Sequence, residues 1–240
     1  MTNEAMALAI ALPLLGGLAT AAWPTRSRGI GIGILTVLLS GASVTWLFLL
    51  MMSHGEAYQL LGGWQPGLAI VLHADALSTL MLLLTALVTL AVSVYATHYF
   101  RSSREAARFW PLWLLLLAAL NGLFLSADLF NLYVTLELLG LSAVALTALG
   151  GKRESIRAAL RSLVVGLLGS LGSRVGVAML SAAFGTLDRQ QVGKRIAVDP
   201  ASEMALLLMT GGLLLKTALF PLHFWLPAAH SNAPAPVSAA

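Results

Sequence analysis

Long apolar runs, separated by short polar stretches, make up most of the chain. Each run is close to the ~20 residues that a helix needs to cross the hydrocarbon core of a bilayer. The runs predict transmembrane helices over residues 5–23, 29–52, 74–98, 109–126, 128–149, 157–185 and 203–226, and the segment after Ala228 has the pattern of another helix start. We therefore expect an all-α integral membrane protein with about seven transmembrane helices plus the start of an eighth.

Composition agrees with this assignment. Of the 240 residues, 58% are hydrophobic and 10% are charged, whereas a soluble domain has about 25% charged residues. The formal net charge is +4. Because most basic residues sit in short loops, we expect them to orient the chain in a lipid bilayer rather than to bind nucleic acid.

The basic residues occupy alternate loops. The first, third and fifth loops carry them and the second and fourth carry none, so we expect the odd-numbered loops in the cytoplasm and the N-terminus outside. The sixth loop departs from this pattern. The odd loops hold Arg26, Arg28, Arg101, Arg104, Arg108, Lys152, Arg153 and Arg157, and the sixth holds Arg189, Lys194 and Arg195.

The first run is flanked unlike a secretory signal peptide. Glu4 precedes it, and Arg26 and Arg28 follow it, which reverses the usual charge order. We expect residues 5–23 to remain as a transmembrane helix; cleavage near residues 19–21 is the less favoured alternative.

Loop composition predicts further features of the organisation. Residues 62–75 are Gly-rich and alternating, which favours an extracytoplasmic hairpin or extended segment leading into the third span. We expect residues 1–105 to hold helices one to three with this hairpin, and residues 106–240 to hold the rest. The sequence stops where Pro234 and Pro236 begin a helix, which is typical of a chain that continues.

Two opposite charges fall deep inside predicted helices. Glu137 is ~13 Å along its helix from Asp128, and Lys216 is ~20 Å from the start of its own helix. A single charge at that depth costs ~2.5–3.5 kcal/mol, and an isolated lysine there tends to lose its proton. We expect Glu137 and Lys216 to pair, so that breaking the pair lets one release a proton or the other take one. The alternative is a purely structural ion pair or a protonated, hydrogen-bonded Glu137.

Prolines interrupt the segment that follows Lys216. Pro221 and Pro227 each lack the backbone N–H that a helix needs, so we expect the seventh helix to be broken. Broken helices at membrane depth are tolerated where they line a cavity or a water path. Lys216, His223 and His230 are seven residues apart, which would place them on roughly one helical face as a proton relay. Each histidine alone could equally be an interfacial residue.

Two further residues are auxiliary candidates. Asp128 either caps the fifth span or joins the proton path. Arg174 has three interpretations: it extends outward to the interface, pairs with a carboxylate, or contacts a partner subunit. Arg161, nearer the helix end, is expected to extend outward. Around Arg174, small residues predict close packing of another helix, at positions 166, 169, 170, 172, 173 and 176.

The sequence carries no pattern typical of a cofactor or metal site. It contains no cysteine, and it lacks the glycine-rich nucleotide-binding, His-Glu-x-x-His, haem and iron–sulfur patterns. We therefore expect no cofactor, no metal and no catalytic chemistry on this chain alone. Whether it belongs to a larger enzyme complex stays open at this point.

Three stretches carry a long and specific pattern: HADALSTLMLLLTALVTLAVSVY, ADLFNLYVTLELLGLSA and LLLKTALFPLHFWLPAAHSNAPAPVSA. They resemble the proton-conducting antiporter-like family, which includes the D subunit of the multisubunit cation/proton antiporter and the antiporter-like membrane subunits of complex I and related hydrogenases. The resemblance implies that Glu137 and Lys216 form the family's charge pair and that His230 begins the eighth segment. Ala228 and Arg174 depart from the family, where an acidic and an apolar residue are usual.

The resemblance also implies an incomplete conduit. The family is built from two inverted halves with the site at their interface, and this chain resembles the first. Residues 106–240 would then form the first half-channel. The implied partners are other membrane subunits, protons and Na⁺ or K⁺, in a bacterial inner membrane.

Three functions of different classes follow from these observations. The first is an ion-transport subunit that exchanges Na⁺ or K⁺ for protons, which the hairpin and third span favour. The second is a proton-pumping membrane-arm subunit of an NADH-quinone oxidoreductase or hydrogenase complex. The third is a scaffold or inactive remnant. The charge pair does not separate the first two, because both classes use it.

Overall fold

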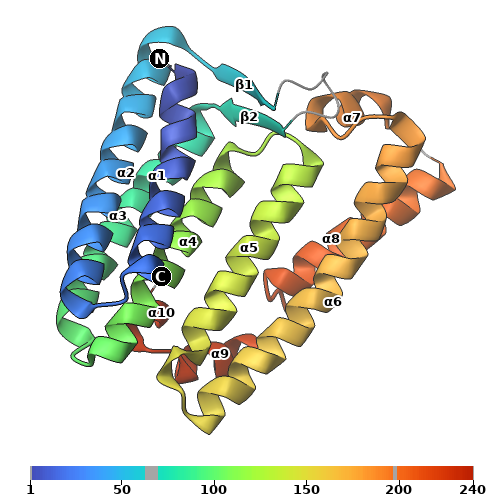
Figure 1. Ribbon diagram of the computed structural model, residues 1–240. Coiled ribbons are helices and arrows are strands. Elements are labelled where there is room, and N and C mark those ends of the chain that lie inside the picture. Colours follow the sequence, from blue (N-terminus) through green and yellow to red (C-terminus); the bar gives the residue numbers. More distant parts are fainter. Residues whose placement is uncertain (1, 63–69, 197–198, 240) are drawn as a thin grey trace.

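Long helices form the body of the protein in the computed structural model, which describes residues 2–62, 70–196 and 199–239 (Figure 1). Within these ranges, six helices are long and apolar enough to cross a membrane. They are α1 (Thr2–Ala22), α2 (Arg26–His54), α3 (Ala76–Tyr99), α4 (Ser103–Leu125), α5 (Leu129–Thr147) and α6 (Arg153–Phe184). The fold is therefore all-α and crosses the membrane several times, as expected.

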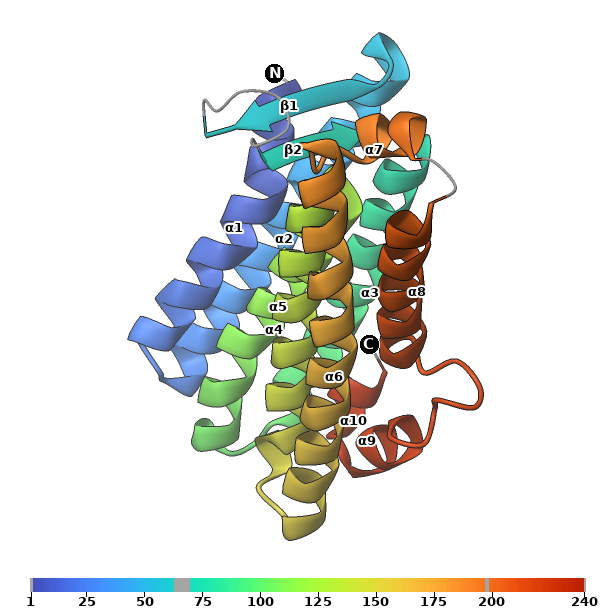
Figure 2. The ribbon, with the colours of Figure 1, turned by 90° about the vertical axis from the view of Figure 1, so that its right-hand side faces the viewer.

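Shorter elements complete the chain. They are the 3₁₀ turn η1 (Ala148–Gly150) and the helices α7 (Arg189–Arg195), α8 (Pro200–Lys216), α9 (Leu226–Asn232) and α10 (Ala235–Ser238). The expected span over residues 203–226 is interrupted, because α8 ends at Lys216 and the next nine residues are not helical. This segment extends away from the helices before the chain returns at α9 (Figure 2).

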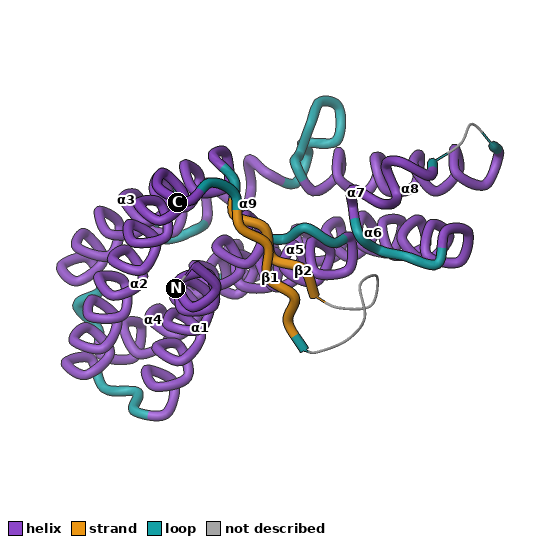
Figure 3. The backbone as a smooth tube through the Cα atoms, turned by 90° about the horizontal axis from the view of Figure 1, so that it is seen from above, coloured by secondary structure: helices purple, strands orange, loops and turns teal. Residues whose placement is uncertain are grey.

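Seen from above, α1 to α4 gather on one side, and α5, α6 and α8 extend to the other (Figure 3). Close contacts hold the first group together. Trp110 of α4 lies over Gly33 of α2, where an added Cβ would be 2.1 Å from the indole ring. The Trp113 indole N–H donates to Ser93 Oγ at 2.8 Å, so a polar atom buried between α3 and α4 is satisfied.

A two-stranded antiparallel hairpin covers the end where α1 begins. Strand β1 (Ala57–Leu61) pairs with β2 (Ile70–Ala74), from Ala57 opposite Ala74 to Leu61 opposite Ile70. The prediction of a hairpin over residues 62–75 was therefore wrong about the first strand, which precedes Gly62, and residues 63–69 lie outside the described residues. The sequence signal was misleading because Gly62, with a φ of 89°, follows the end of the first strand rather than beginning it.

Asp75 connects the hairpin to α3. Its carboxylate accepts a hydrogen bond from the backbone N–H of Ser78 at 2.7 Å, which caps the helix. Burial is the largest single influence and raises the pKa of Asp75, but the hydrogen bonds from Ser78 together with the charges of His73 and Arg189 outweigh it and hold the pKa below its ordinary value. The hairpin is thereby fixed to the first turn of the third transmembrane helix.

The connections group at two ends, in the alternating order that the loop charges predict. The hairpin and α7 lie at one end, and the connections α1–α2, α3–α4 and α5–α6 lie at the other (Figure 1). The sixth loop, with its unexpected basic residues, joins the hairpin end, where Gln190 donates to Tyr58 Oη at 2.9 Å. Arg195 donates to the carbonyl of Phe184 at 3.0 Å. A cation at the carboxyl end of α6 is electrostatically favourable, which gives one of the basic residues of this loop a structural use.

Candidate functional site

Asp128 fixes the start of the helix that carries Glu137. Its Oδ1 accepts from the backbone N–H of Asn131 at 2.7 Å, and its Oδ2 accepts from the N–H of Val71 in β2 at 2.9 Å. Asp128 therefore caps α5 and ties the hairpin to it, and it lies outside the cavity around Glu137. Of the two interpretations that the sequence left open, this geometry favours the cap.

Replacing Asp128 tests this structural role. Asp128→Ala removes the cap, worth ~1 kcal/mol, and leaves the buried Val71 N–H without a partner, at ~1–3 kcal/mol. We expect a lower thermal midpoint of the purified assembly and unchanged ion transport per assembled complex. Asp128→Asn, which keeps one oxygen for the cap, should lose less stability. Normal stability with lost transport would instead place Asp128 in the ion path.

Lys216 is the last residue of α8, and the chain turns immediately after it. Ala218 adopts a left-handed conformation with φ of 52°, and the N–H of Leu219 reaches back five residues to the carbonyl of Leu214 at 3.2 Å. The carbonyl of Leu215 accepts from the backbone N–H of Ala218 at 3.3 Å and from the indole N–H of Trp225 at 3.1 Å. The returning segment is thus bound close to Lys216.

Glu137 and Lys216 meet between α5 and the end of α8. Lys216 Nζ donates to Glu137 Oε1 at 2.8 Å, and the side chains of Lys216 and Glu137 are 15% and 16% exposed. Ser170 of α6 also donates to Glu137 Oε1. The pair that the sequence predicts is therefore in contact, and a hydroxyl group that the sequence did not assign to it joins the site.

Arg174 of α6 also contacts Glu137. Its Nη2 lies 3.8 Å from Glu137 Oε2, and its Nε donates to the hydroxyl of Tyr133. The guanidinium also lies over the Tyr133 ring, 5.0 Å from the ring centroid. Of the three interpretations of Arg174, pairing with a carboxylate is the one that this geometry favours.

Close packing of α6 against α8 brings these groups together. A Cβ added to Gly212 would lie 2.3 Å from the carbonyl oxygen of Gly169, and one added to Gly176 would lie 2.6 Å from that of Ala205. Most of the predicted small-residue positions lie on this contact, although Gly166 has open space beside it. Backbone contact this close requires glycine, because no side chain fits between the helices.

Gly212→Leu should separate α6 from α8. We expect loss of ~1–3 kcal/mol or more from overpacking, measured as a lower thermal midpoint and a smaller yield of assembled complex. Gly211→Leu is the matched control, because a Cβ added to the adjacent Gly211 would have no atom within 4 Å. Equal behaviour of the two variants would contradict the role of this contact.

A cavity of about 470 Å³ adjoins the pair. It lies between α4, α5, α6, the end of α8 and the C-terminal helices, and apolar side chains form most of its wall. Its polar lining includes Glu137, Lys216, Thr147, Ser162, Ser170, Thr217, Trp225 and His230. A cavity with an ion pair at one side and scattered hydroxyl groups along its wall can hold water.

The two histidines have different surroundings. His230 of α9 lines the cavity, and its Nδ1 is 3.2 Å from Ser238 Oγ. His223 lies outside the cavity in the non-helical segment, and its ring is tilted by 31° to that of Phe220 with ring centroids 5.5 Å apart. Both histidines are exposed. The expectation that Lys216, His223 and His230 share one helical face is wrong, because the helix ends before His223.

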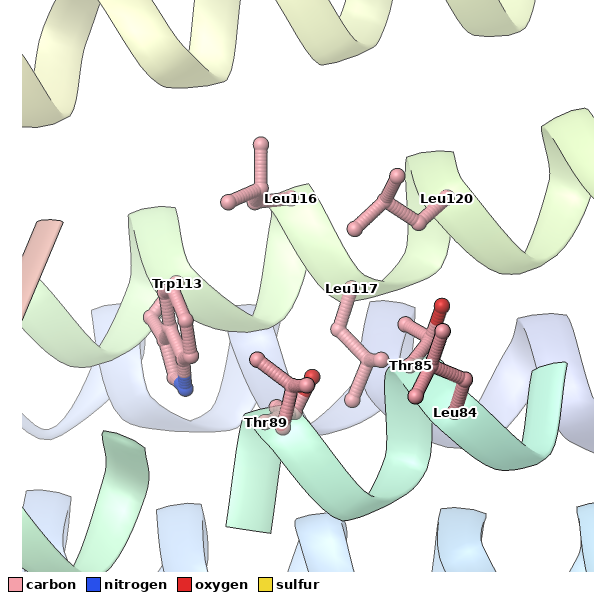
Figure 4. A pocket seen from close by; sticks show the side chains of 8 residues that line it. Leu84, Thr85, Thr89, Trp113, Leu116, Leu117 and Leu120 are labelled. Carbon is pink, nitrogen blue, oxygen red and sulfur yellow. The ribbon is translucent and has the colours of Figure 1, made fainter. Parts of the chain in front are cut away.

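A second cavity, of about 190 Å³, lies between α3 and α4 (Figure 4). Leucines and threonines form its wall together with Trp113 and Val88, and it contains no ionisable side chain. It therefore offers no group that carries a charge. Across the described part of the chain, no group of three or more His, Asp or Glu residues is placed to bind a metal.

Tyr133 and Trp225 are site residues that the sequence reasoning missed. Tyr133 precedes Glu137 by four residues, and Ser170 precedes Arg174 by four, so each pair lies on one face of its helix. This shared spacing is a signal that could have indicated a joint site. Trp225 is beyond such reasoning, because its contact depends on how the chain returns after α8.

Two family models match the chain. One, described as NADH:quinone oxidoreductase/Mrp antiporter, TM, matches residues 126–240. The other, described as NADH-Ubiquinone oxidoreductase (complex I), chain 5 N-terminus, matches residues 67–110. The two matches therefore include the whole candidate site, strand β2, all of α3 and the start of α4.

Curated relatives point the same way. The chain is 41% identical over 211 residues to the N subunit of the NADH-quinone oxidoreductase of Desulforudis audaxviator. It is 34% identical over 208 residues to the D subunit of the Na⁺/H⁺ antiporter of Bacillus subtilis. Each match includes 85% of this chain and 41% of the relative.

Solved structures share the fold. A chain of an archaeal respiratory complex, the membrane-bound sulfane sulfur reductase, matches with a TM-score of 0.88 and 30% identity, over 97% of this chain and 49% of that one. A chain of the Mrp complex from Dietzia sp. DQ12-45-1b matches with a TM-score of 0.85 and 26% identity, over 98% and 45%. The present chain thus spans less than half the length of these relatives and structures.

Proposed function

The chain belongs to the proton-conducting antiporter-like family, and we propose that it moves protons through Glu137 and Lys216 as a membrane subunit of a multisubunit Na⁺ or K⁺/H⁺ antiporter. The observation that carries this proposal is the 2.8 Å contact between Lys216 Nζ and Glu137 Oε1 beside a cavity in a membrane protein. A buried acid and base in direct contact stabilise each other's charge, so separating them favours proton transfer from one or to the other.

The position of Lys216 suits such a separation. It ends α8, and the following nine residues are not helical, so the ammonium group is carried by a helix end rather than a helix interior. Movement of residues 217–225 would displace Lys216 without unfolding α8. In the proposed cycle, contact with Glu137 keeps Lys216 protonated, and loss of contact releases its proton into the cavity.

His230 is the proposed next station for that proton. It lines the same cavity as Glu137 and Lys216. The hydroxyl groups of Thr147 on α5 and Ser162 on α6 line that cavity too. Water held by these groups would connect Lys216 to the imidazole. His223 lies outside the cavity and has no part in the proposed route. All of these groups lie within residues 106–240, the proposed first half-channel, and residues 1–105 would support it.

Partners and location follow from the same proposal. Relatives of this chain are named as subunits of antiporter and respiratory assemblies, and they are more than twice its length. We propose that the route continues through further membrane subunits and through the part of the path that the longer relatives contain. The proposed location is a bacterial inner membrane, with the hairpin outside.

A second candidate is a proton-pumping membrane-arm subunit of an NADH-quinone oxidoreductase-type complex. The 41% identity to the N subunit of an NADH-quinone oxidoreductase favours it. This alternative uses the same charge pair and differs in what drives the separation. In the antiporter a cation gradient drives it, and in the respiratory complex a redox reaction on other subunits drives it.

Vesicles that contain the assembled complex separate the two functions. A pH gradient is imposed, and Na⁺ or K⁺ is added without any electron donor. We expect the added cation to collapse the gradient in vesicles with the chain and not in vesicles without it. Proton movement that requires NADH and quinone and ignores the cation would support the second candidate, and movement under neither condition would refute both.

A further inference from the structure

Two cationic side chains lie close to the single carboxylate of Glu137. Lys216 Nζ contacts Oε1 at 2.8 Å, and Arg174 Nη2 lies 3.8 Å from Oε2. The two cations come from different helices and approach different oxygens of one carboxylate. A buried acid needs one counter-charge to be neutralised, so the second requires an explanation.

Arg174 is held independently of Lys216. Helices α5 and α6 run antiparallel, and two successive turns of each face one another: Tyr133 meets Arg174, and Glu137 meets Ser170. The Tyr133 hydroxyl accepts from Arg174 Nε while its ring lies beneath the guanidinium. None of these contacts involves α8. Movement of Lys216 would therefore leave Arg174 in place.

The two cations also differ in chemistry. A guanidinium stays protonated at any physiological pH, whereas an ammonium group can release its proton when its surroundings change. The Lys216 side chain is only 15% exposed, and burial without a counter-charge disfavours the charged form of an ammonium group. Of the two cations, only Lys216 is thus suited to exchange its proton.

We infer that Arg174 is a positioning residue that keeps Glu137 ionised and paired when Lys216 moves away. This inference rests on the proposed function, in which separation of Glu137 and Lys216 moves a proton. Arg174 and Ser170 still stabilise the charge of the Glu137 carboxylate, so it stays ionised and takes up no proton from the cavity. The proton that moves on separation is therefore the one on Lys216, and Arg174 sets that choice.

A double-mutant cycle on the assembled complex tests the inference without measuring transport. The variants are Arg174→Leu, Lys216→Ala and the double variant, each read by the temperature at which the complex falls apart. Either cation alone can pair with Glu137, so the double variant should lose several degrees more than the sum of the single losses. On a Glu137→Gln background this excess should disappear. Additive losses on the native background would overturn the inference.

Transport supplies the second readout. We expect Arg174→Leu to reduce cation-driven proton exchange per assembled complex about tenfold and Arg174→Lys to restore at least half of it. Arg161→Leu is the matched control, since it removes an arginine ~20 Å away along the same helix. Equal losses for the leucine and lysine variants at position 174 would also count against the inference. If Glu137→Gln transports normally while the cycle still shows the excess, the proposed function fails and the ion-pair arrangement stands.

Discussion

We expect Glu137→Gln to abolish proton-coupled transport and to leave the complex assembled. The amide has the size of the carboxylic acid and can still accept from Ser170, but it carries no charge to hold Lys216 protonated. Lys216 then no longer acts as a positioned proton-transfer group, and losing such a group reduces rates by about 100-fold or more. Transport is measured as cation-driven collapse of a pH gradient, normalised to the amount of assembled complex.

Glu203→Gln is the control for this variant. Glu203 lies in the first turn of α8 and is exposed, so its replacement removes the same charge far from the pair. We expect it to transport normally. A Glu137→Gln variant that assembles and transports at the native rate would remove Glu137 from the mechanism.

Replacing Lys216 is expected to have the second large effect on transport. Two variants separate the contribution of its charge from that of its exchangeable proton. Lys216→Ala removes both the charge and the proton, so we expect transport to fall by about 100-fold or more. The loss of stability should stay below the ~3–5 kcal/mol of an uncompensated buried charge, because Glu137 keeps Arg174 and Ser170. Lys216→Arg keeps the charge but cannot release a proton. It should stay stable and still fail to transport.

Lys194→Ala is the matched control, because this lysine is exposed on α7, outside the cavity. Stability is measured as the thermal midpoint of the assembly, and transport as before. Native transport by Lys216→Arg would show that no proton leaves this residue during the cycle. Normal transport by Lys216→Ala would exclude the residue altogether.

The sequence contained enough information to predict the helices and the depth of the two charges. Apolar runs give the length of a span, and the position of Glu137 within its run gives its depth. The ends of α4 and α6 were less predictable, because each continues through a turn of charged residues, Arg104 to Arg108 and Arg153 to Arg157. Helix geometry does not stop where the apolar run stops.

The neighbours of Glu137 were harder to predict for a physical reason. Helix α5 is apolar on nearly all sides, so its sequence gives no preferred face and no indication of which helix meets Glu137. The contact with Arg174 depends on the rotation of α5 and α6 about their axes. The histidine relay failed for another reason: the seven-residue spacing has meaning only while the helix continues, and the chain leaves helical geometry at Thr217.

The bonds of Asp128 have a mechanical consequence. One carboxylate oxygen binds the second strand of the hairpin and the other binds the first turn of α5. Neither part can shift without stretching a short bond to the other. A neighbouring protein that displaced the hairpin would therefore also displace the start of α5. Because α5 is a continuous helix, that displacement would reach Glu137 about two turns further along it.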